Sequence, residues 1–404
     1  MKVRFTSWIT LMRSLLWVRS LHHGARSTRG WVALLAIPLL VLHGLVTSLH
    51  AQEDWEITSE SERAVERGLD WLAANQGPEG NWTSNDLGLV SLGALAFMAA
   101  GHQPGRGRYG AVVERALDYV MDHAKPSGLL NISNAQRDMY NHGLATFVLG
   151  QAHGMTRSRD RRLNQTLDQA LKLIANTQCD DGGWEYRAAR RPRGHDLSLV
   201  VMQAKALRSA VDSGLEVPNE VIQLAIQSVR EHYGPENGRR DAPESEQMQL
   251  RGQFTYQKSG TSGTLAMAAA GVVCLQEFGQ GDDWRIPKNV EVISVEIDRL
   301  PHPKDGTLPF DAYTTYYVGQ ALYQVGGEPW RKGYPRLRDY LVQSQLKDSA
   351  NASTNGLWRD NGANGGGKVG GRPGDLFGTA VGCLVLALPN RYLPILSEAQ
   401  TAGM

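Results

Sequence analysis

The most restrictive feature of this sequence is a helical hairpin that is written six times, with a period of about 50 residues. Each copy joins an amphipathic helix to an almost wholly apolar helix through a turn of the form Gly-x-Trp, Gly-x-Leu or Gly-x-Phe. These turns are Gly80–Trp82, Gly128–Leu130, Gly182–Trp184, Gly252–Phe254, Gly306–Leu308 and Gly356–Trp358. A helix that is apolar on all sides must be buried. No hairpin can achieve this alone, so neighbouring hairpins must stack.

The pattern predicts an all-α protein. The amphipathic helices are expected near residues 59–76, 109–123, 160–178, 218–233, 287–299 and 334–346. The apolar helices are expected near residues 86–97, 138–154, 196–213, 259–278, 311–325 and 375–388. The first and last hairpins look like the others and lack the polar outer face that an open array needs. We therefore expect a closed α/α toroid, in which six apolar helices form an inner ring inside an outer ring of six.

The toroid is expected to be one domain over residues 58–390, followed by a C-terminal tail, 391–404.

The charge of the chain argues against nucleic acid as a partner. Six of the 42 Lys and Arg residues lie in residues 1–52, which hold no acidic residue, so 36 basic and 41 acidic residues remain in 53–404. A slightly acidic domain is not typical of nucleic-acid binding.

Residues 31–49 form an uncharged apolar run behind that basic segment. This order is typical of an export signal, with Ala51 as a cleavage point. The run is also long enough to be an uncleaved membrane anchor. Residues 1–51 are thus expected to export the rest of the chain to the periplasm or the extracellular space, and to be its only contact with a membrane.

Aspartate recurs where the apolar helices begin. Asp86, Asp138, Asp196, Asp311 and Asp375 open five of the six. Aspartate is a good N-cap, which is one sufficient explanation. In a ring of alternating hairpins, however, all inner helices point the same way, so these carboxylates surround one mouth of the central cavity. Asp138, Asp196, Asp311 and Asp375, with His142 near the start of its helix, are therefore candidate catalytic residues.

Candidate binding residues lie near the same helix starts. Arg187, Arg190 and Arg191 precede Asp196, together with His195, and an arginine cluster suits a phosphate or a carboxylate. The alternative is a solvated loop. The remaining candidates could line an apolar pocket or could simply pack at the rim of the ring: Tyr140, His142, Tyr313, Tyr316 and Tyr317.

The pattern Gln-x-x-x-Gly-x-Trp at Gln76–Trp82 and Gln178–Trp184 resembles the QW motif of squalene-hopene cyclases. The inner-helix pattern is similar to that of protein prenyltransferase β subunits. Both groups belong to the terpenoid cyclase/prenyltransferase α/α-toroid superfamily, and the resemblance covers residues 58–390. It implies the toroid fold and an isoprenoid-like ligand in the cavity.

The catalytic residues of those families do not carry over. The Asp-x-Asp-Asp motif with which such cyclases protonate their substrate is absent from the sequence. Prenyltransferases hold zinc with Asp-x-Cys and a histidine, but the matching positions here hold Asp196, Ser198 and Thr314. Hydroxyl groups are poor zinc ligands. The three cysteines are too scattered for a zinc ribbon or a disulfide scaffold. We therefore expect no metal and no cofactor.

Three functions remain open. The first is an exported toroid that holds an apolar, isoprenoid-like ligand or a protein partner without those catalytic sites. The second is an enzyme that acts on an isoprenoid substrate through a non-standard site. The third is a carbohydrate-active α/α-barrel enzyme, for which Asp138, Asp196, Asp311 and Asp375 would supply the two carboxylates.

Overall fold

The computed structural model describes residues 55–82, 86–156, 160–236, 239–260, 263–348, 350–360 and 374–397. The chain divides into two units, Met1–Trp55 and Glu56–Met404, and the second carries the fold. The predicted export segment, residues 1–51, lies outside the described residues. Within the described part of the chain, no helix has the length and apolar character needed to cross a membrane.

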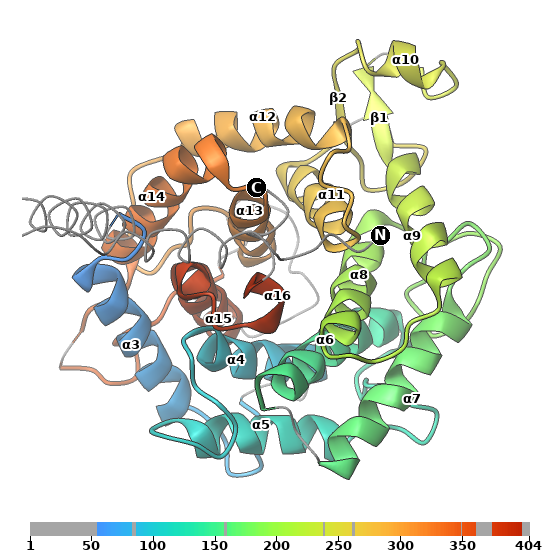
Figure 1. Cartoon of the computed structure of the whole chain (residues 1–404). Helices are drawn as coiled ribbons and strands as arrows, with labels where there is room; N and C mark the ends of the chain where they lie inside the picture. Colours follow the sequence, from blue (N-terminus) through green and yellow to red (C-terminus); the bar gives the residue numbers. More distant parts are fainter. Residues whose placement is uncertain are drawn as a thin grey trace, which may run out of the picture. The chain divides into compact units, whose positions relative to one another are not determined.

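Six apolar helices form a closed inner ring (Figure 1). Each packs against the next, and the last packs against the first. They are α4 (Leu87–Ala99), α6 (Asp138–Thr156), α8 (Leu197–Asp212), α11 (Leu265–Glu277), α13 (Ala312–Val325) and α15 (Gly374–Ala387). Every residue of α4 is buried, as a helix that is apolar on all sides requires.

Six amphipathic helices surround that ring (Figure 1). They are α3 (Ser59–Ala74), α5 (Gly110–Asp122), α7 (Arg161–Thr177), α9 (Asn219–Glu231), α12 (Arg285–Asp298) and α14 (Gly327–Ser344). The predicted all-α toroid of six hairpins is confirmed. One outer helix begins seven residues before the predicted Tyr334, because its first turns bury Trp330, which stacks on Tyr334.

The Gln-x-x-x-Gly-x-Trp motif joins neighbouring hairpins. The Gln178 side chain donates from Nε2 to the Gly182 carbonyl of its own turn at 3.1 Å, and to the Val221 carbonyl of the next outer helix, α9, at 2.9 Å. The Trp184 indole donates to the carbonyl of Ile174 in α7 at 2.9 Å. Gln76 makes the equivalent bonds to its own turn and to α5. The motif therefore fixes the position of each outer helix relative to the next.

A third copy of this motif closes the ring. Gln345 at the end of α14 donates to the Gly356 carbonyl at 2.9 Å and to the carbonyl of Ala64 in α3 at 2.8 Å. Trp358 donates to Leu341 in α14 at 3.0 Å. The sequence pattern does not reveal this copy, because Gln345 lies eleven residues before its glycine. It links the last hairpin to the first.

Five of the six turn glycines have the positive φ expected where a helix ends and the chain reverses. Gly182, with φ +78°, also lies so close to the Leu224 carbonyl that a Cβ would overlap it. The exception is Gly252, which the sequence placed in a turn between two helices but which lies in strand β2 (Gly252–Phe254). This strand pairs antiparallel with β1 (Tyr233–Pro235), so the chain needs no left-handed residue there.

The two strands belong to an insertion between α9 and α11, together with the short helix α10 (Glu244–Gln247). Figure 1 shows β1, β2 and α10 extending outward from the ring beyond α9 and α12. The insertion continues past β2 to Gly263, which bridges back to Thr255. Helix α11 therefore begins at Leu265, six residues later than the predicted start at residue 259.

Residues 391–397 fill one end of the inner ring. Helix α16 (Pro394–Ser397) packs against α6 and α8, and Figure 1 shows it inside the ring. Tyr323 in the last turn of α13 donates to the Leu396 carbonyl at 2.9 Å. The Ile395 N–H donates to Gln151 of α6 at 3.1 Å. Residues 391–397, expected as the start of a tail, thus close the C-terminal end of the ring.

Candidate functional site

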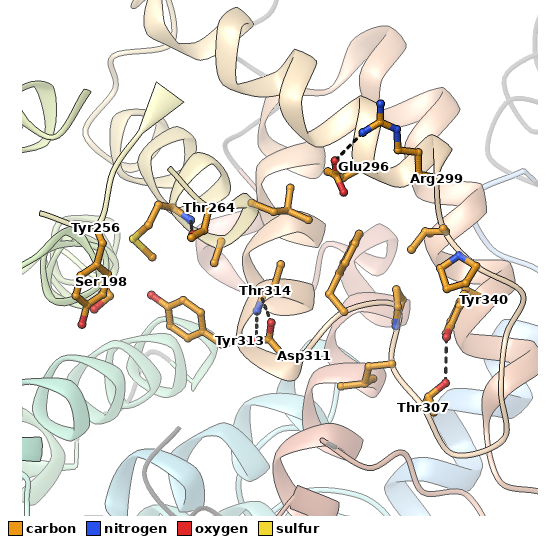
Figure 2. Close-up of a pocket in the computed structure, with 18 of the residues that line it drawn as sticks. Ser198, Tyr256, Thr264, Glu296, Arg299, Thr307, Asp311, Tyr313, Thr314 and Tyr340 are labelled. Carbon is orange, nitrogen blue, oxygen red and sulfur yellow. Dashed lines mark hydrogen bonds and ion pairs between the residues drawn. The ribbon is translucent and has the colours of Figure 1, made fainter. Parts of the chain in front are cut away.

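The opposite end of the ring contains a cavity of about 1050 Å³. Its wall is built from the first turns of α6, α8, α11 and α13, and from the loop that joins α12 to α13. Figure 2 shows Ser198 and Tyr256 at one end of this cavity, and Thr307 and Tyr340 at the other. Its size lies at the upper end of the range for small-molecule sites.

The wall combines aromatic, apolar and charged side chains. The aromatic and larger apolar residues are Tyr140, Tyr186, Tyr256, Leu265, Met267, Leu300, Leu308, Phe310, Tyr313 and Tyr340. The residues with ionisable or basic side chains are Arg137, Glu296, Arg299, His302, Lys304 and Asp311. Few of these charges lie at the end formed by α6 and α8, where the tyrosines gather. The cavity therefore has an aromatic end and a more polar end.

Asp196 lies directly behind the aromatic end. It is the N-cap of α8, only 1% exposed, and its Oδ1 accepts from the Leu199 N–H at 3.3 Å and from the Ser198 hydroxyl. Its Oδ2 accepts from the Tyr186 hydroxyl at 2.6 Å and lies 2.9 Å from Nδ1 of His195. Asp196 is therefore surrounded by four hydrogen-bonding groups.

The Tyr186 hydroxyl also forms a hydrogen bond with the Tyr256 hydroxyl. Because Tyr186 gives its proton to Asp196, Tyr256 is the donor in this phenol pair. Burial and the nearby Asp196 carboxylate raise the pKa of Tyr186 well above its usual value, and the same causes raise the pKa of Tyr256 to about 12. Both phenols are neutral donors at ordinary pH. They form a hydrogen-bonded chain from the cavity wall to a buried carboxylate.

The other predicted aspartates also lie at inner-helix starts, but in different surroundings. Asp311 lines the cavity and caps α13, accepting from the Thr314 N–H at 3.0 Å. Asp138 is buried outside the cavity wall, where it accepts from Asn131 at 2.7 Å. Asp375 is half exposed and pairs with Arg359. The structure therefore brings Asp196 and Asp311 to the cavity, one behind its wall and the other in it.

His142 lies within the ring wall and does not line the cavity. Its Nδ1 accepts from the Leu130 N–H at 3.1 Å, and its Nε2 lies 3.0 Å from the Ala170 carbonyl. Both ring nitrogens are thus used in holding a turn and an outer helix. Burial lowers the pKa of His142 to about 4, so the ring is neutral.

The predicted binding residues separate into two groups. Tyr140 and Tyr313 line the cavity, and Tyr140 stacks on Tyr186 with ring centres 6.1 Å apart. His195 contacts Asp196 at the rim. Tyr316 and Tyr317 are buried deeper in the ring. The predicted arginines, Arg187, Arg190 and Arg191, are exposed and do not line the cavity.

Sequence reasoning missed the two phenols that connect Asp196 to the cavity. Tyr186 stands two residues after the motif tryptophan, which was a usable signal. Tyr256 comes from the insertion, 70 residues further along the chain, and no local pattern pairs it with Tyr186. Among the described residues, no three His, Cys, Asp or Glu side chains come together in a way that could hold a metal ion.

A buried ion pair lies deeper in the ring and was also missed. Lys205 of α8 contacts Glu277 of α11 at 2.9 Å, and each side chain is 2% exposed. Gln320 of α13 accepts a further hydrogen bond from Lys205, and Gln324 donates to Glu277 at 2.8 Å. The cluster joins three consecutive inner helices.

The fold defines the class of this protein as an α/α toroid. No family model matches the chain. A drimenyl diphosphate synthase from Streptomyces showdoensis is 27% identical over 187 residues, which are 45% of this chain and 33% of the synthase. The chain thus spans about a third of the length of that curated relative. The match is to a terpene synthase and fits a terpenoid cyclase-like fold.

Solved structures similar to this chain include an α-1,6-mannanase, GH76A, of Salegentibacter sp. HEL1_6. It has a TM-score of 0.49 at 10% identity, covering 83% of this chain and 98% of the mannanase. An inactive variant of the same mannanase in complex with α-1,6-mannotriose gives the same TM-score, identity and coverage.

Proposed function

We propose that this protein is an enzyme that takes an isoprenoid-like substrate into the cavity and moves a proton at its aromatic end. The observation that carries the proposal is the hydrogen-bonded chain from Tyr256 through Tyr186 to the buried Asp196 carboxylate. The partial match to drimenyl diphosphate synthase supports the substrate class. The large, tyrosine-rich cavity suits an apolar chain.

The chain of hydroxyl groups can remove one proton from a substrate. Tyr256 accepts the substrate proton as it gives its own to Tyr186, and Tyr186 gives its proton to Asp196. Neither phenol has to ionise, which agrees with the raised pKa values of both. The reverse sequence returns the proton. A positioned acid–base group of this kind contributes about 10²- to 10⁴-fold to a rate.

A second candidate function is ligand holding without turnover. The observation that favours it is the number of donors around Asp196. The carboxylate caps α8, accepts from the Tyr186 and Ser198 hydroxyls and contacts His195, so it can be explained as a structural group. In that case the same cavity would bind the isoprenoid-like molecule unchanged.

Turnover assays separate these functions. The full chain would be incubated with farnesol, farnesyl diphosphate, squalene or α-1,6-mannotriose, and the products identified by mass spectrometry. We expect conversion of an isoprenoid and a loss of about 100-fold in Tyr186→Phe. Tyr392→Phe is the matched control, because Tyr392 is exposed and does not line the cavity.

Three results would contradict the proposal. Binding of an isoprenoid without conversion would support ligand holding. Conversion of α-1,6-mannotriose alone would support a carbohydrate-active enzyme. Full activity of Tyr186→Phe would show that the hydrogen-bonded chain takes no part in the reaction.

A further inference from the structure

The insertion supplies part of the cavity wall through residues 252–260, which we call the strap. The strap comprises β2 and the turn that follows it. Its first part is held firmly: Phe254 is fully buried against Gly271 of α11, and its N–H donates to Asn289 of α12 at 3.0 Å. The chain then leaves the sheet and passes over the start of α8. The strap thus begins in the outer layer and ends at the cavity.

Tyr256 connects the strap to the candidate site through two atoms. Its carbonyl oxygen accepts from the N–H of Leu197, the first residue of α8, at 3.0 Å. Its hydroxyl forms a hydrogen bond with the Tyr186 hydroxyl. The Tyr256 side chain is nevertheless 40% exposed, so packing alone does not hold it in this position. The strap must be fixed by its other contacts.

Thr255 and Lys258 make those contacts. The N–H and the hydroxyl of Thr255 donate to the His232 carbonyl at 2.9 and 2.8 Å. The Nζ of Lys258 donates to Asp181 Oδ2 at 2.9 Å, to the Asp181 carbonyl at 3.1 Å and to Glu231 Oε2 at 2.8 Å. Asp181 belongs to the turn between α7 and α8, and Glu231 is the last residue of α9. The lysine side chain is 23% exposed. One ammonium group therefore fastens the strap to two parts of the ring.

Asp181 is itself held in place as the anchor for Lys258. Its Oδ1 accepts from the N–H groups of Gly183 at 3.1 Å and Gly194 at 2.8 Å. Burial opposes its charge, but the hydrogen bonds from Lys258 and the two N–H groups outweigh burial and hold the pKa of Asp181 below its usual value. The two backbone N–H groups thus hold the Asp181 carboxylate in position beside Lys258.

Arg240 makes a different set of hydrogen bonds to the strap. Its guanidinium donates to the Tyr233 carbonyl at 2.7 Å, the Thr255 hydroxyl at 2.9 Å and the Gly260 carbonyl at 2.5 Å. These three acceptors lie within the insertion, and Arg240 also donates to the Glu231 carbonyl at the end of α9, at 3.0 Å. Arg240 therefore maintains the shape of the strap and ties it to α9, whereas Lys258 fastens it to the turn that carries Asp181.

We propose that Lys258 is a positioning residue for the acid–base chain: its ion pairs hold the strap so that Tyr256 stays hydrogen-bonded to Tyr186. This inference rests on the proposed function of Tyr256 and Tyr186. It assigns to the insertion a role in building the site, and to Asp181 a role in anchoring it. Neither Lys258 nor Asp181 lines the cavity.

Hydrogen exchange of the full chain tests the positioning without any turnover. In Lys258→Met, we expect at least fivefold faster exchange in peptides that cover 195–200 and 252–260, because the Leu197 N–H loses its partner. Lys258→Arg should exchange like the wild type. Lys172→Met is the matched control, since Lys172 forms an ion pair with Asp168 on the exposed side of α7. Unchanged exchange in Lys258→Met would overturn the proposal.

If Lys258→Met does not fold, Glu231→Gln removes one of the two ion pairs and leaves Asp181 in place. We then expect a smaller increase in exchange in the same two peptides. Raising salt from about 0.05 to 1 M should act in the same direction on the wild type, because salt screens partly exposed ion pairs. An absence of both effects would contradict the proposal.

A double-mutant cycle tests the coupling to chemistry. We expect Lys258→Met to lower kcat about tenfold in the wild type and to have no further effect in Tyr256→Phe, with most activity recovered in Lys258→Arg. An equal loss in both backgrounds would indicate a general structural role and would overturn the proposal. If the wild type converts none of the substrates, the proposed function fails, while the exchange result still decides whether Lys258 holds the strap.

Discussion

The two ends of the inner ring are built from the same six helices but differ in what covers them. At the C-terminal end, the chain's own last helix enters the ring, and Leu393, Ile395 and Leu396 are buried there. At the N-terminal end, aspartate caps and a cavity take its place. Helix C-termini expose carbonyl oxygens, and helix N-termini expose N–H groups that favour carboxylates. The carbonyl end is thus covered by residues 391–397, whereas the N–H end holds an open cavity.

The largest effect on stability is expected between the two ends. Lys205→Met would leave the Glu277 carboxylate buried without its cationic partner. We expect a loss of about 3–5 kcal/mol in the free energy of unfolding, measured by urea denaturation. The double variant Lys205→Met/Glu277→Met should recover most of this loss. A loss below about 1 kcal/mol in the single variant would show that the inner ring does not depend on the pair.

The next largest effect on stability is expected at the C-terminal end of the ring. Leu396→Ala would leave a cavity where a side chain that is 3% exposed fills the ring. We expect a loss of about 2–4 kcal/mol in the free energy of unfolding. Binding of an isoprenoid at the other end should change less than twofold. If binding falls in parallel with stability, the two ends are not independent and the comparison fails.

Acid should destabilise the ring through His142. Its pKa is lowered to about 4 by burial, whereas an unfolded histidine titrates near 6.5. Between these values the unfolded chain binds more protons, so stability is lost as pH falls from about 6.5 towards 4. Lowering the pH from 7 to 5 should therefore destabilise the wild type by about 2 kcal/mol more than His142→Gln. Equal losses in urea titrations would contradict this assignment.

His232 adds the same acid sensitivity to the wild type and to His142→Gln, so it does not change the difference between them. Burial also lowers its pKa to about 4, so it retains its own acid sensitivity in the His142→Gln variant. The variant is consequently expected to lose stability in acid as well, only less steeply than the wild type.

The smallest effect on stability is expected at the open end. In Asp196→Asn, the amide oxygen still caps α8, because asparagine and aspartate are similar N-caps. Tyr186 and His195 can each change from donor to acceptor. We expect less than about 1 kcal/mol of lost stability and about 100-fold slower conversion of an isoprenoid. A loss of stability with an unchanged conversion rate would show that Asp196 only caps helix α8.

Local sequence determined the toroid. The apolar helices, the turn glycines and the Gln-x-x-x-Gly-x-Trp motif are all short-range patterns, and each acts on its own hairpin or on the next. Stacking of such units leaves few alternatives to a ring. Local sequence also placed Asp196 and Asp311 correctly at helix starts, because N-capping is a local preference.

Only the tertiary structure decided which side chains meet. Tyr186 and Tyr256 lie 70 residues apart, and Lys205 and Glu277 lie 72 residues apart. Neither pairing has a local signature, because it depends on how closely two hairpins approach after the ring has closed. The same holds for residues 391–397, which show no periodic pattern and yet pack inside the ring against α6 and α8. Periodic sequence encodes a helix and its buried face, whereas contacts between distant hairpins follow from the packing of the whole ring.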